Sequence, residues 1–326
     1  MADYYRKLFE PNYGEAAPDA IIDVGSDVGC PFDMEHPTES RIRLNFETIA
    51  RLTQEWKFTF CFPRLMRIQI ENLTIDSEGY QLPVRIYKPE GTGPYKTMVF
   101  LHGGGWTMNN PDVYDTVHRY FASYGNVLVI APDYRLAPEH KFPKGFQDCY
   151  NTVVWASEHC SVYGGDPARL CVCGDSAGGN LSAAVCLRAR DEHGPAIAKQ
   201  FLIFPATAFH LGYRTESEKR YGNGGYFISM NSESGEWIPY LNDPSENQLP
   251  YVSPLYAEDL SHLPPACFIS AECDPILDQG LMYAAKLLDQ GNQVEYHIYQ
   301  GMVHAFLNRP QQKTFEAMND IIAAMP

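Results

Sequence analysis

The sequence predicts an α/β fold in which a mostly parallel, eight-stranded sheet is flanked by helices. Three observations support this prediction. The chain has 326 residues, 45% of them are hydrophobic, and short apolar runs alternate with helix-like segments from about residue 66 onward. Such alternation is typical of parallel sheets, because each crossover between parallel strands needs a connecting segment that is usually a helix.

Eight short apolar runs are the expected strands. In chain order they cover 67–75, 82–88, 97–101, 127–131, 170–173, 200–204, 267–270 and 294–299. The first two are split by Ser77-Glu78-Gly79-Tyr80, so we expect them to form an antiparallel hairpin. Helix-like segments follow at 145–158, 180–190, 281–290 and 314–324. We expect the apolar residues of 314–324 either to close the core or to join two copies of the chain in a homodimer. Closing the core is the commoner use of such a face.

Two segments interrupt this alternation. Residues 1–65 include a stretch, 42–56, whose apolar residues recur at helical spacing. Residues 206–252 are too long for an ordinary connection between strands and are rich in Tyr, Gly and Asn. We therefore expect an N-terminal cap segment (1–65) and a main domain (66–326) with a cap insertion at about 206–252.

Bulk composition excludes several classes of partner. The net charge of −15 argues against nucleic acid or an anionic membrane surface. The N-terminus has no apolar signal region, and no apolar stretch approaches the roughly 20 residues of a membrane span. Nine cysteines lack paired C-x-x-C spacing, which fits a reducing compartment. We therefore expect a cytoplasmic protein.

A serine between glycines is the first candidate for chemistry. The segment Gly174-Asp175-Ser176-Ala177-Gly178 follows an apolar strand and precedes a helix-like segment. Glycines allow the close backbone approach that a tight strand-to-helix turn requires. Such a turn exposes the serine hydroxyl and places the amide of Ala177 at the positive end of the helix. Ser176 is the candidate nucleophile, although this motif alone is a common chance match.

A glycine-rich loop supplies candidate donors for a developing negative charge. His102-Gly103-Gly104-Gly105-Trp106 follows the strand at 97–101. A tetrahedral intermediate needs hydrogen-bond donors that are already aimed at its oxyanion. We expect the backbone amides of Gly103, Gly104 and Ala177 to be these donors.

Ser176 also needs a base, and that base needs an acid. Among ten histidines, His304 follows a strand and is expected at the same sheet edge as Ser176. His297 lies within that strand, and His102 is expected to orient the glycine loop. Asp274 follows the strand at 267–270 and is the candidate acid. Glu272 and Asp278 are its rivals.

Several blocks of sequence resemble the hormone-sensitive-lipase-like family of α/β-hydrolases, in its GDSAG subgroup. They are HGGGW (102–106), DYRLAPEHKFP (133–143), GDSAGGNL (174–181), YVSPL (251–255), LPPA (263–266), ECDPI (272–276) and GMVHAF (301–306). The resemblance covers roughly residues 80–325. It implies an α/β-hydrolase fold, Ser176, Asp274 and His304 as a triad, the three amides as an oxyanion hole, and a cap from residues 1–65 and 206–252.

These observations predict a serine carboxylesterase for small-molecule esters of short to medium chain length, with no metal and no cofactor. The candidate substrate contacts are four aromatic residues, one at the glycine loop and three in the insertion: Trp106, Tyr213, Trp237 and Tyr240. Two alternatives stay open. One is a deacetylase or acyl esterase acting on carbohydrates or amides. The other is a ligand-binding receptor, as in the plant gibberellin receptors of this family, which lose the catalytic histidine.

Overall fold

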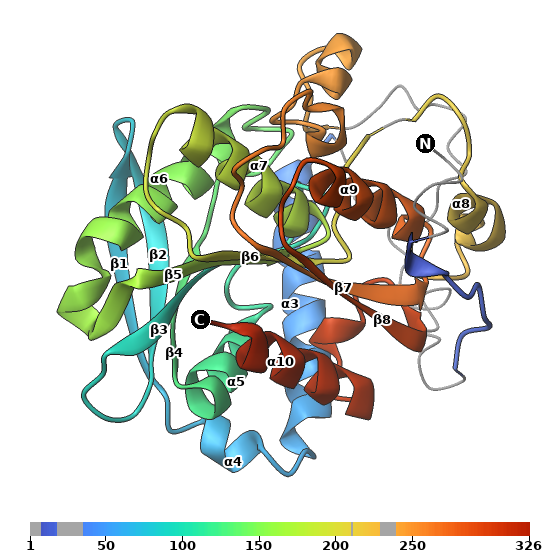
Figure 1. The fold of residues 1–326 in the computed structure, drawn as a ribbon. Coiled ribbons are helices and arrows are strands. Elements are labelled where there is room, and N and C mark those ends of the chain that lie inside the picture. The colour runs from blue at the N-terminus through green and yellow to red at the C-terminus, as the bar shows by residue number, and fades with distance from the viewer. Residues whose placement is uncertain (1–7, 18–34, 210, 229–238) are drawn as a thin grey trace.

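The computed structural model describes residues 8–17, 35–209, 211–228 and 239–326. One eight-stranded sheet runs through the molecule in the order β1-β2-β4-β3-β5-β6-β7-β8 (Figure 1). Its strands are β1 (Gln69–Ser77), β2 (Tyr80–Lys88), β3 (Tyr95–Leu101), β4 (Val127–Pro132), β5 (Gly165–Asp175), β6 (Lys199–Ile203), β7 (Ala266–Cys273) and β8 (Val294–Val303). All eight predicted strands are confirmed, and β5 begins five residues earlier than predicted.

Strand directions also follow the prediction. β1 and β2 form an antiparallel hairpin closed by the two-residue turn Glu78-Gly79, and β2 pairs antiparallel with β4. Each remaining pair in the sheet is parallel. The carboxyl ends of β3, β5, β7 and β8 therefore meet at one edge, where the candidate residues follow them.

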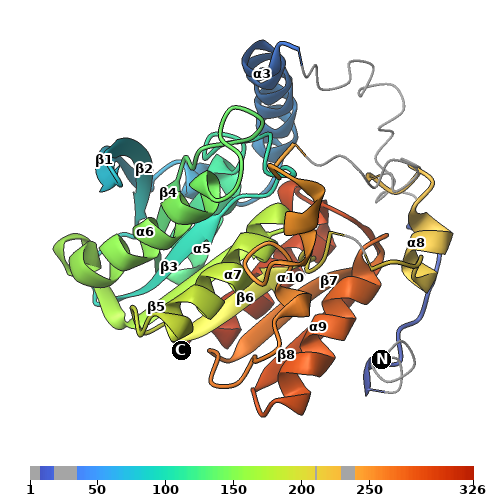
Figure 2. The ribbon, with the colours of Figure 1, turned by 90° about the horizontal axis from the view of Figure 1, so that it is seen from above.

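Helices cover both faces of the sheet (Figures 1 and 2). One face carries α6 (Lys144–His159), α7 (Ala177–Asp191) and α9 (Leu277–Asp289), and the other carries α3 (Pro37–Lys57), α4 (Phe62–Leu65), α5 (Asp115–Gly125) and α10 (Gln312–Ala324). Alternate side chains of β3 divide between the two cores: Val99 and Leu101 enter one, and Met98 and Phe100 enter the other. The strands are thus buried on both faces, as their apolar runs predicted.

The apolar face of α10 is used inside the molecule. Ala317, Met318 and Ile321 are buried in the core cluster that also contains Phe121 of α5. This face therefore closes the core, the commoner of the two uses expected for it. Among the helices of the described residues, none combines the length and the apolarity that crossing a bilayer requires.

The N-terminal helix α3 confirms the helical spacing, but only half of its apolar face is buried. Leu52 and Trp56 lie in the core, and the indole nitrogen of Trp56 donates to the carbonyl of Asn308 at 3.0 Å. Ile42 and Phe46 stay 65% and 73% exposed. The C-terminal half of α3 therefore anchors the helix, while its N-terminal half lies along the loops above the sheet edge (Figure 2).

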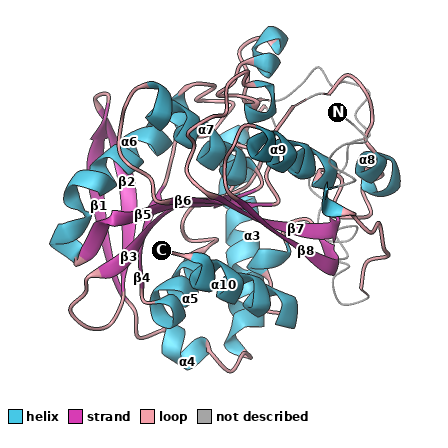
Figure 3. Cartoon of the chain, viewed as in Figure 1, coloured by secondary structure: helices cyan, strands magenta, loops and turns pink. Residues whose placement is uncertain are grey.

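The insertion at 206–252 is mostly loop in its described part (Figure 3). It contains α8 (Glu216–Tyr221) and the 3-10 helix η2 (Pro244–Gln248). The remaining 3-10 helices are η1 (Cys160–Tyr163), η3 (Pro254–Tyr256) and η4 (Phe306–Asn308). Asn180 of α7 fastens both ends of the insertion, because its amide donates to the carbonyls of Ala206 and Val252 at 2.8 Å each.

Candidate active site

Ser176 occupies a sharp turn between β5, which ends at Asp175, and α7, which begins at Ala177. Its φ of +54° and ψ of −116° are sparsely populated for a residue with a side chain. Such a conformation persists only where the surroundings hold it. Here the Ser176 amide donates to Ile203 of β6, and its carbonyl accepts from the amides of Asn180 and Ala206.

The flanking glycines are required by close packing. A Cβ at Gly178 would lie 1.9 Å from the carbonyl oxygen of Leu101, and one at Gly174 would lie 2.4 Å from that of Gly178. Both distances are far inside van der Waals contact with backbone, which cannot move aside easily. The spacing of the two glycines therefore lets α7 start directly against β3 and β5.

The structure brings the three predicted side chains into one hydrogen-bonded row. Nε2 of His304 lies 2.9 Å from Oγ of Ser176, and Nδ1 lies 2.7 Å from Oδ2 of Asp274. Asp274 and His304 are buried, and the ring of Phe204 packs against the imidazole with centroids 4.9 Å apart. The apposition of base to nucleophile and of acid to base is the geometry that nucleophilic catalysis by serine requires.

Strand pairing produces this row. Asp274 follows the last residue of β7 and His304 follows the last residue of β8, and those two residues, Cys273 and Val303, are paired in the sheet. The second oxygen of Asp274 accepts the amide of Ile276 at 2.9 Å, which fixes the carboxylate. The row is therefore assembled by parallel strands from distant parts of the chain.

The rival acids have other partners. Glu272 is buried and accepts the amide of Gly301 at 2.7 Å, so it holds the base of the His304 loop. Asp278 accepts from the hydroxyl of Tyr13 at 2.8 Å and from the amide of Ser217 at 3.1 Å.

The rival histidines have other partners as well. His297 pairs with Glu295 at 2.9 Å. His102 contacts the carbonyl of Gly103 through Nδ1 at 2.9 Å, and burial lowers its pKa to about 4. A buried, neutral imidazole in this position fits the predicted role of orienting the glycine loop.

The prediction for Gly103 is wrong. Its amide points into the core, where it donates to Oδ1 of Asp175 at 2.8 Å and to the hydroxyl of Tyr114 at 3.1 Å. A donor already used by a buried carboxylate is not available to a substrate. The amides of Gly104 and Gly105, in contrast, donate no hydrogen bond to any described residue.

Asp175 is a functional candidate that the sequence reasoning passed over. Its Oδ2 accepts from the Tyr114 hydroxyl at 2.8 Å, and its side chain is almost fully buried. Burial raises the pKa of Asp175 to about 6. Asp175 thus fixes the glycine loop from the position beside Ser176. The one sequence signal for this role is its place inside the G-D-S-A-G motif.

Aromatic side chains form a wall beside the glycine loop. Trp106 stacks on Phe209 and on Tyr240, with ring centroids 4.6 and 5.1 Å apart. Trp106 retains 8% exposure and Tyr240 only 1%, so Tyr240 supports the wall from behind. Tyr213 is 49% exposed and its hydroxyl contacts the sulfur of Met282 of α9. Trp237 lies outside the described residues.

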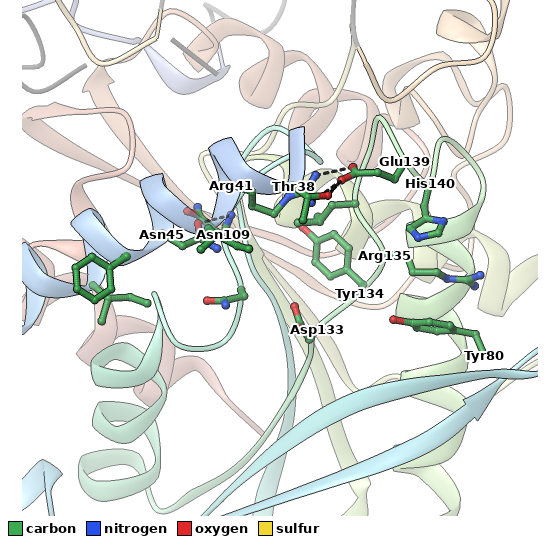
Figure 4. Close-up of a pocket in the computed structure, with 15 residues that line it drawn as sticks. Thr38, Arg41, Asn45, Tyr80, Asn109, Asp133, Tyr134, Arg135, Glu139 and His140 are labelled. Carbon is green, nitrogen blue, oxygen red and sulfur yellow. Dashed lines mark hydrogen bonds and ion pairs between the residues drawn. The ribbon is translucent and has the colours of Figure 1, made fainter. Parts of the chain in front are cut away.

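The N-terminal helix is tied to the same loop. Arg41 of α3 donates to the carbonyls of Thr107 at 2.6 Å and Ala137 at 3.0 Å, and Asn45 accepts the amide of Asn109 at 3.1 Å. Arg41 also pairs with Glu139 at 2.8 Å (Figure 4). This hydrogen bond is the main reason that the pKa of Glu139 is lowered to about 2.

These contacts border a cavity of about 550 Å³ between α3 and the segment 133–140 (Figure 4). The exposed side chains of Ile42 and Phe46 form part of its wall, and Asp133 lies on the opposite side. Asn109 and Asn110, which follow the glycine loop in the sequence, also line the cavity. The contacts of Arg41 and Asn45 therefore connect the N-terminal segment to the loop that carries the candidate donors.

The chain is similar to known hydrolases and esterases. Residues 98–308 match a family model described as alpha/beta hydrolase fold. The chain is 38% identical over 270 residues to carboxylic ester hydrolase LipN of Mycobacterium tuberculosis, covering 80% of this chain and 70% of that protein. It is 37% identical over 245 residues to an arylesterase of Saccharolobus solfataricus, covering 74% and 78%. The solved structure of a hyperthermophilic esterase from the archaeon Pyrobaculum calidifontis is similar with a TM-score of 0.85, at 30% identity over 96% of this chain and 98% of that one.

Proposed function

This chain belongs to the alpha/beta hydrolase family and is a carboxylic ester hydrolase, and we propose that it cleaves esters of short to medium acyl groups through an acyl intermediate on Ser176. The observation that carries the proposed mechanism is the hydrogen-bonded row from Ser176 through His304 to Asp274. No part of this mechanism needs a metal or a cofactor, because the serine is activated by proton transfer to the imidazole.

The reaction proceeds in two displacements. The Ser176 hydroxyl attacks the ester carbonyl while Nε2 of His304 takes its proton, and the carbonyl oxygen becomes an oxyanion. The intermediate collapses to an acyl-serine, and His304 returns the proton to the departing alcohol. Water then attacks the acyl-serine by the same route and releases the carboxylic acid. Asp274 holds the tautomer in which Nδ1 carries a hydrogen and stabilises the imidazolium that forms.

The oxyanion is held by backbone amides. We assign Gly104 and Ala177 as predicted, with Gly105 in place of Gly103, because the amide of Gly103 is occupied by Asp175. The amide of Ala177 is the first of α7, where the helix dipole favours negative charge. Preorganised donors of this kind stabilise the transition state more than the substrate.

The proposed preference for short to medium acyl groups follows from the aromatic wall. The stacked rings of Trp106, Phe209 and Tyr240 form a rigid surface next to the glycine loop, and Phe227 lies near His304 with ring centroids 6.0 Å apart. Residues 1–65 and 206–252 would form the cap over this space. A stacked wall under a cap favours a compact acyl group over a long extended one.

The alternatives differ in how the structure supports them. A receptor on this scaffold does not require an acceptor for the serine proton, whereas here His304 lies 2.9 Å from Ser176, which supports an enzyme. A deacetylase or amidase would use the same three residues and would differ only in the pocket. We also propose a cytoplasmic location, which is supported by the eight buried cysteines of the described residues, none of which is paired in a disulfide.

The test is a panel of p-nitrophenyl acetate, butyrate, octanoate and palmitate. We expect kcat/KM to be highest for acetate or butyrate and lowest for palmitate, and Ser176→Ala to lose at least about 10³-fold on each substrate. Ser157→Ala, which changes a serine on α6 bonded to Val154, is the matched control and keeps its activity. A fluorophosphonate probe is expected to label the wild type and Ser157→Ala, but not Ser176→Ala.

Two results would contradict the proposal in different ways. Unchanged turnover by Ser176→Ala would remove the assignment of the nucleophile. A preference for palmitate would leave the nucleophile in place but remove the proposed acyl preference. Activity on acetylated sugars without activity on p-nitrophenyl butyrate would favour the carbohydrate deacetylase.

A further inference from the structure

Three side chains that ester hydrolysis does not use converge at the edge of the sheet. They are Cys267 on β7 and Glu295 and His297 on β8, the edge strand next to β7 (Figure 1). A sulfur, a carboxylate oxygen and a ring nitrogen from these residues all lie within 4.8 Å of one another. We propose that Cys267, Glu295 and His297 form a binding site for one zinc ion.

The strand register explains why the three side chains meet. Glu295 and His297 are two residues apart on β8, so they project from the same face of the sheet. Cys267 is paired directly with Glu295 across the β7–β8 ladder. Two side chains at alternate positions of one strand and a third from its neighbour surround a common point, which is what a metal ion requires.

The donor set suits zinc. A thiolate, an imidazole and a carboxylate are its usual protein ligands, at about 2.0–2.3 Å, and three of them leave a fourth tetrahedral position for water. Ligands at those distances are roughly 3.5 Å apart. Nε2 of His297 and Oε1 of Glu295 are closer than this, at 2.9 Å, so these two partly exposed side chains would move apart by roughly half an ångström to share an ion.

Neighbouring charges support the ligands from outside. Oε2 of Glu295 pairs with Nζ of Lys199 at 2.9 Å, which leaves Oε1 facing the histidine. Nδ1 of His297 lies 3.9 Å from Oδ2 of Asp320 on α10, which is beyond hydrogen-bond distance, and that oxygen accepts from the Tyr299 hydroxyl. Asp320 therefore adds negative charge near the ring, which favours a bound cation, without a hydrogen bond to Nδ1.

The charges of the occupied site balance. The Cys267 thiol gives one proton to solvent when the sulfur binds the ion. The resulting thiolate and the carboxylates of Glu295 and Asp320 carry three negative charges, and Zn²⁺ with the Lys199 ammonium carries three positive charges. A neutral group avoids the large cost of an uncompensated charge at a partly buried place.

The site lies far from the chemistry. Cys267 is the second residue of β7 and Asp274 follows its last, a distance of roughly 20 Å along an extended strand. Zinc here would join the edge strand β8 to β7 and stabilise the fold by binding only the native state. The proposal does not depend on the assignment of the triad, because its test measures metal binding.

The test uses the purified full chain, freed of metal with a chelator and titrated with Co²⁺ as a spectroscopic substitute for zinc. We expect one equivalent to bind with a thiolate-to-cobalt absorption band, and Zn²⁺ to displace it. Cys267→Ser is expected to lose the band. His297→Gln and Glu295→Gln are expected to bind Co²⁺ at least tenfold more weakly.

Matched controls separate this site from chance binding. Cys171→Ser changes another buried thiol in the same core cluster, and His262→Gln changes an exposed histidine that is not one of the three clustered side chains; both variants are expected to bind like the wild type. If Cys267→Ser does not fold, the two β8 variants decide. The proposal is overturned if the wild type shows no thiolate band with excess Co²⁺, or if both β8 variants bind Co²⁺ as tightly as the wild type.

Discussion

Asp175 and Gly103 are joined by a buried hydrogen bond of 2.8 Å, from the backbone amide of the glycine to the carboxylate of the aspartate. The residue next to the nucleophile thereby holds the loop that carries the proposed oxyanion donors. Tyr114 completes the connection, because its hydroxyl donates to the second carboxylate oxygen. One side chain therefore fixes the position of the donors relative to Ser176.

Replacing Asp175 with alanine is expected to lower kcat about 10- to 100-fold, with a smaller change in KM. The amide of Gly103 would lose its partner, and the amides of Gly104 and Gly105 would lose their fixed direction toward the developing oxyanion. Steady-state kinetics on p-nitrophenyl butyrate measure the effect. Tyr114→Phe removes only the support of the carboxylate and is expected to have a smaller effect of the same kind. A normal kcat for folded Asp175→Ala would contradict this role.

The same aspartate predicts a pH dependence of stability. Burial raises the pKa of Asp175 to about 6 from an ordinary 3.8. Between these values the native state holds a proton that the unfolded state lacks, so the stability contributed by Asp175 falls as the pH rises from about 4 to 6. The fall is on the order of 2–3 kcal/mol. Urea unfolding at pH 5 and pH 7.5 measures the free energy of unfolding of Asp175→Asn and of the wild type. We expect the variant to gain stability relative to the wild type as the pH rises. A difference between the two free energies that stays constant with pH would contradict the prediction.

Arg41 is expected to influence turnover although it lies on the N-terminal helix. Arg41→Lys would lose the contacts to Thr107, Ala137 and Glu139 that need a planar guanidinium. We expect kcat to fall several-fold because the loop after the glycines becomes less fixed. Arg43→Lys, an exposed change two residues along the same helix, is the control and is expected to be neutral. Equal kinetics for both variants would show that α3 does not position the loop.

Much of this molecule follows from local sequence patterns. The strands were predicted because parallel strands buried on both faces are continuous apolar runs, and Thr97–Leu101 is an example. The triad was predicted because Asp274 and His304 each follow such a run, and parallel strands end at a common edge. Both inferences need only the chain order and the strand direction.

Other features depend on contacts between distant segments. The direction of the Gly103 amide is set by Asp175, more than seventy residues away, so no local pattern indicates which two of three glycines face the substrate. The contacts of Arg41 depend on where α3 lies. The spacing of Glu295 and His297 gave no signal for a metal site, because the third side chain, Cys267, reaches them only through the strand register.

The two acidic residues near the end of β7 are expected to respond differently to loss of charge. Asp274→Asn would remove the acceptor that fixes the His304 tautomer and is expected to lower kcat roughly 10³- to 10⁴-fold. Glu272→Gln keeps an oxygen that can accept from Gly301, so a loss below about tenfold is expected. Kinetics of the two variants at pH 8, with thermal unfolding as a check on folding, compare them. The reverse ranking would make Glu272 the acid.

The turn at Ser176 is expected to tolerate no side chain at Gly178. A methyl group there would lie 1.9 Å from the carbonyl of Leu101, so Gly178→Ala requires β3 and α7 to separate. We expect a lower unfolding temperature and loss of esterase activity. Gly280→Ala in α9 is the matched control, because its nearest neighbour would be the Tyr296 hydroxyl at 3.5 Å, an ordinary contact. That change is expected to raise stability by about 0.5–1 kcal/mol, since alanine favours the helix. If Gly178→Ala unfolds at the wild-type temperature and remains active, the close approach of strand and helix is not what the turn requires.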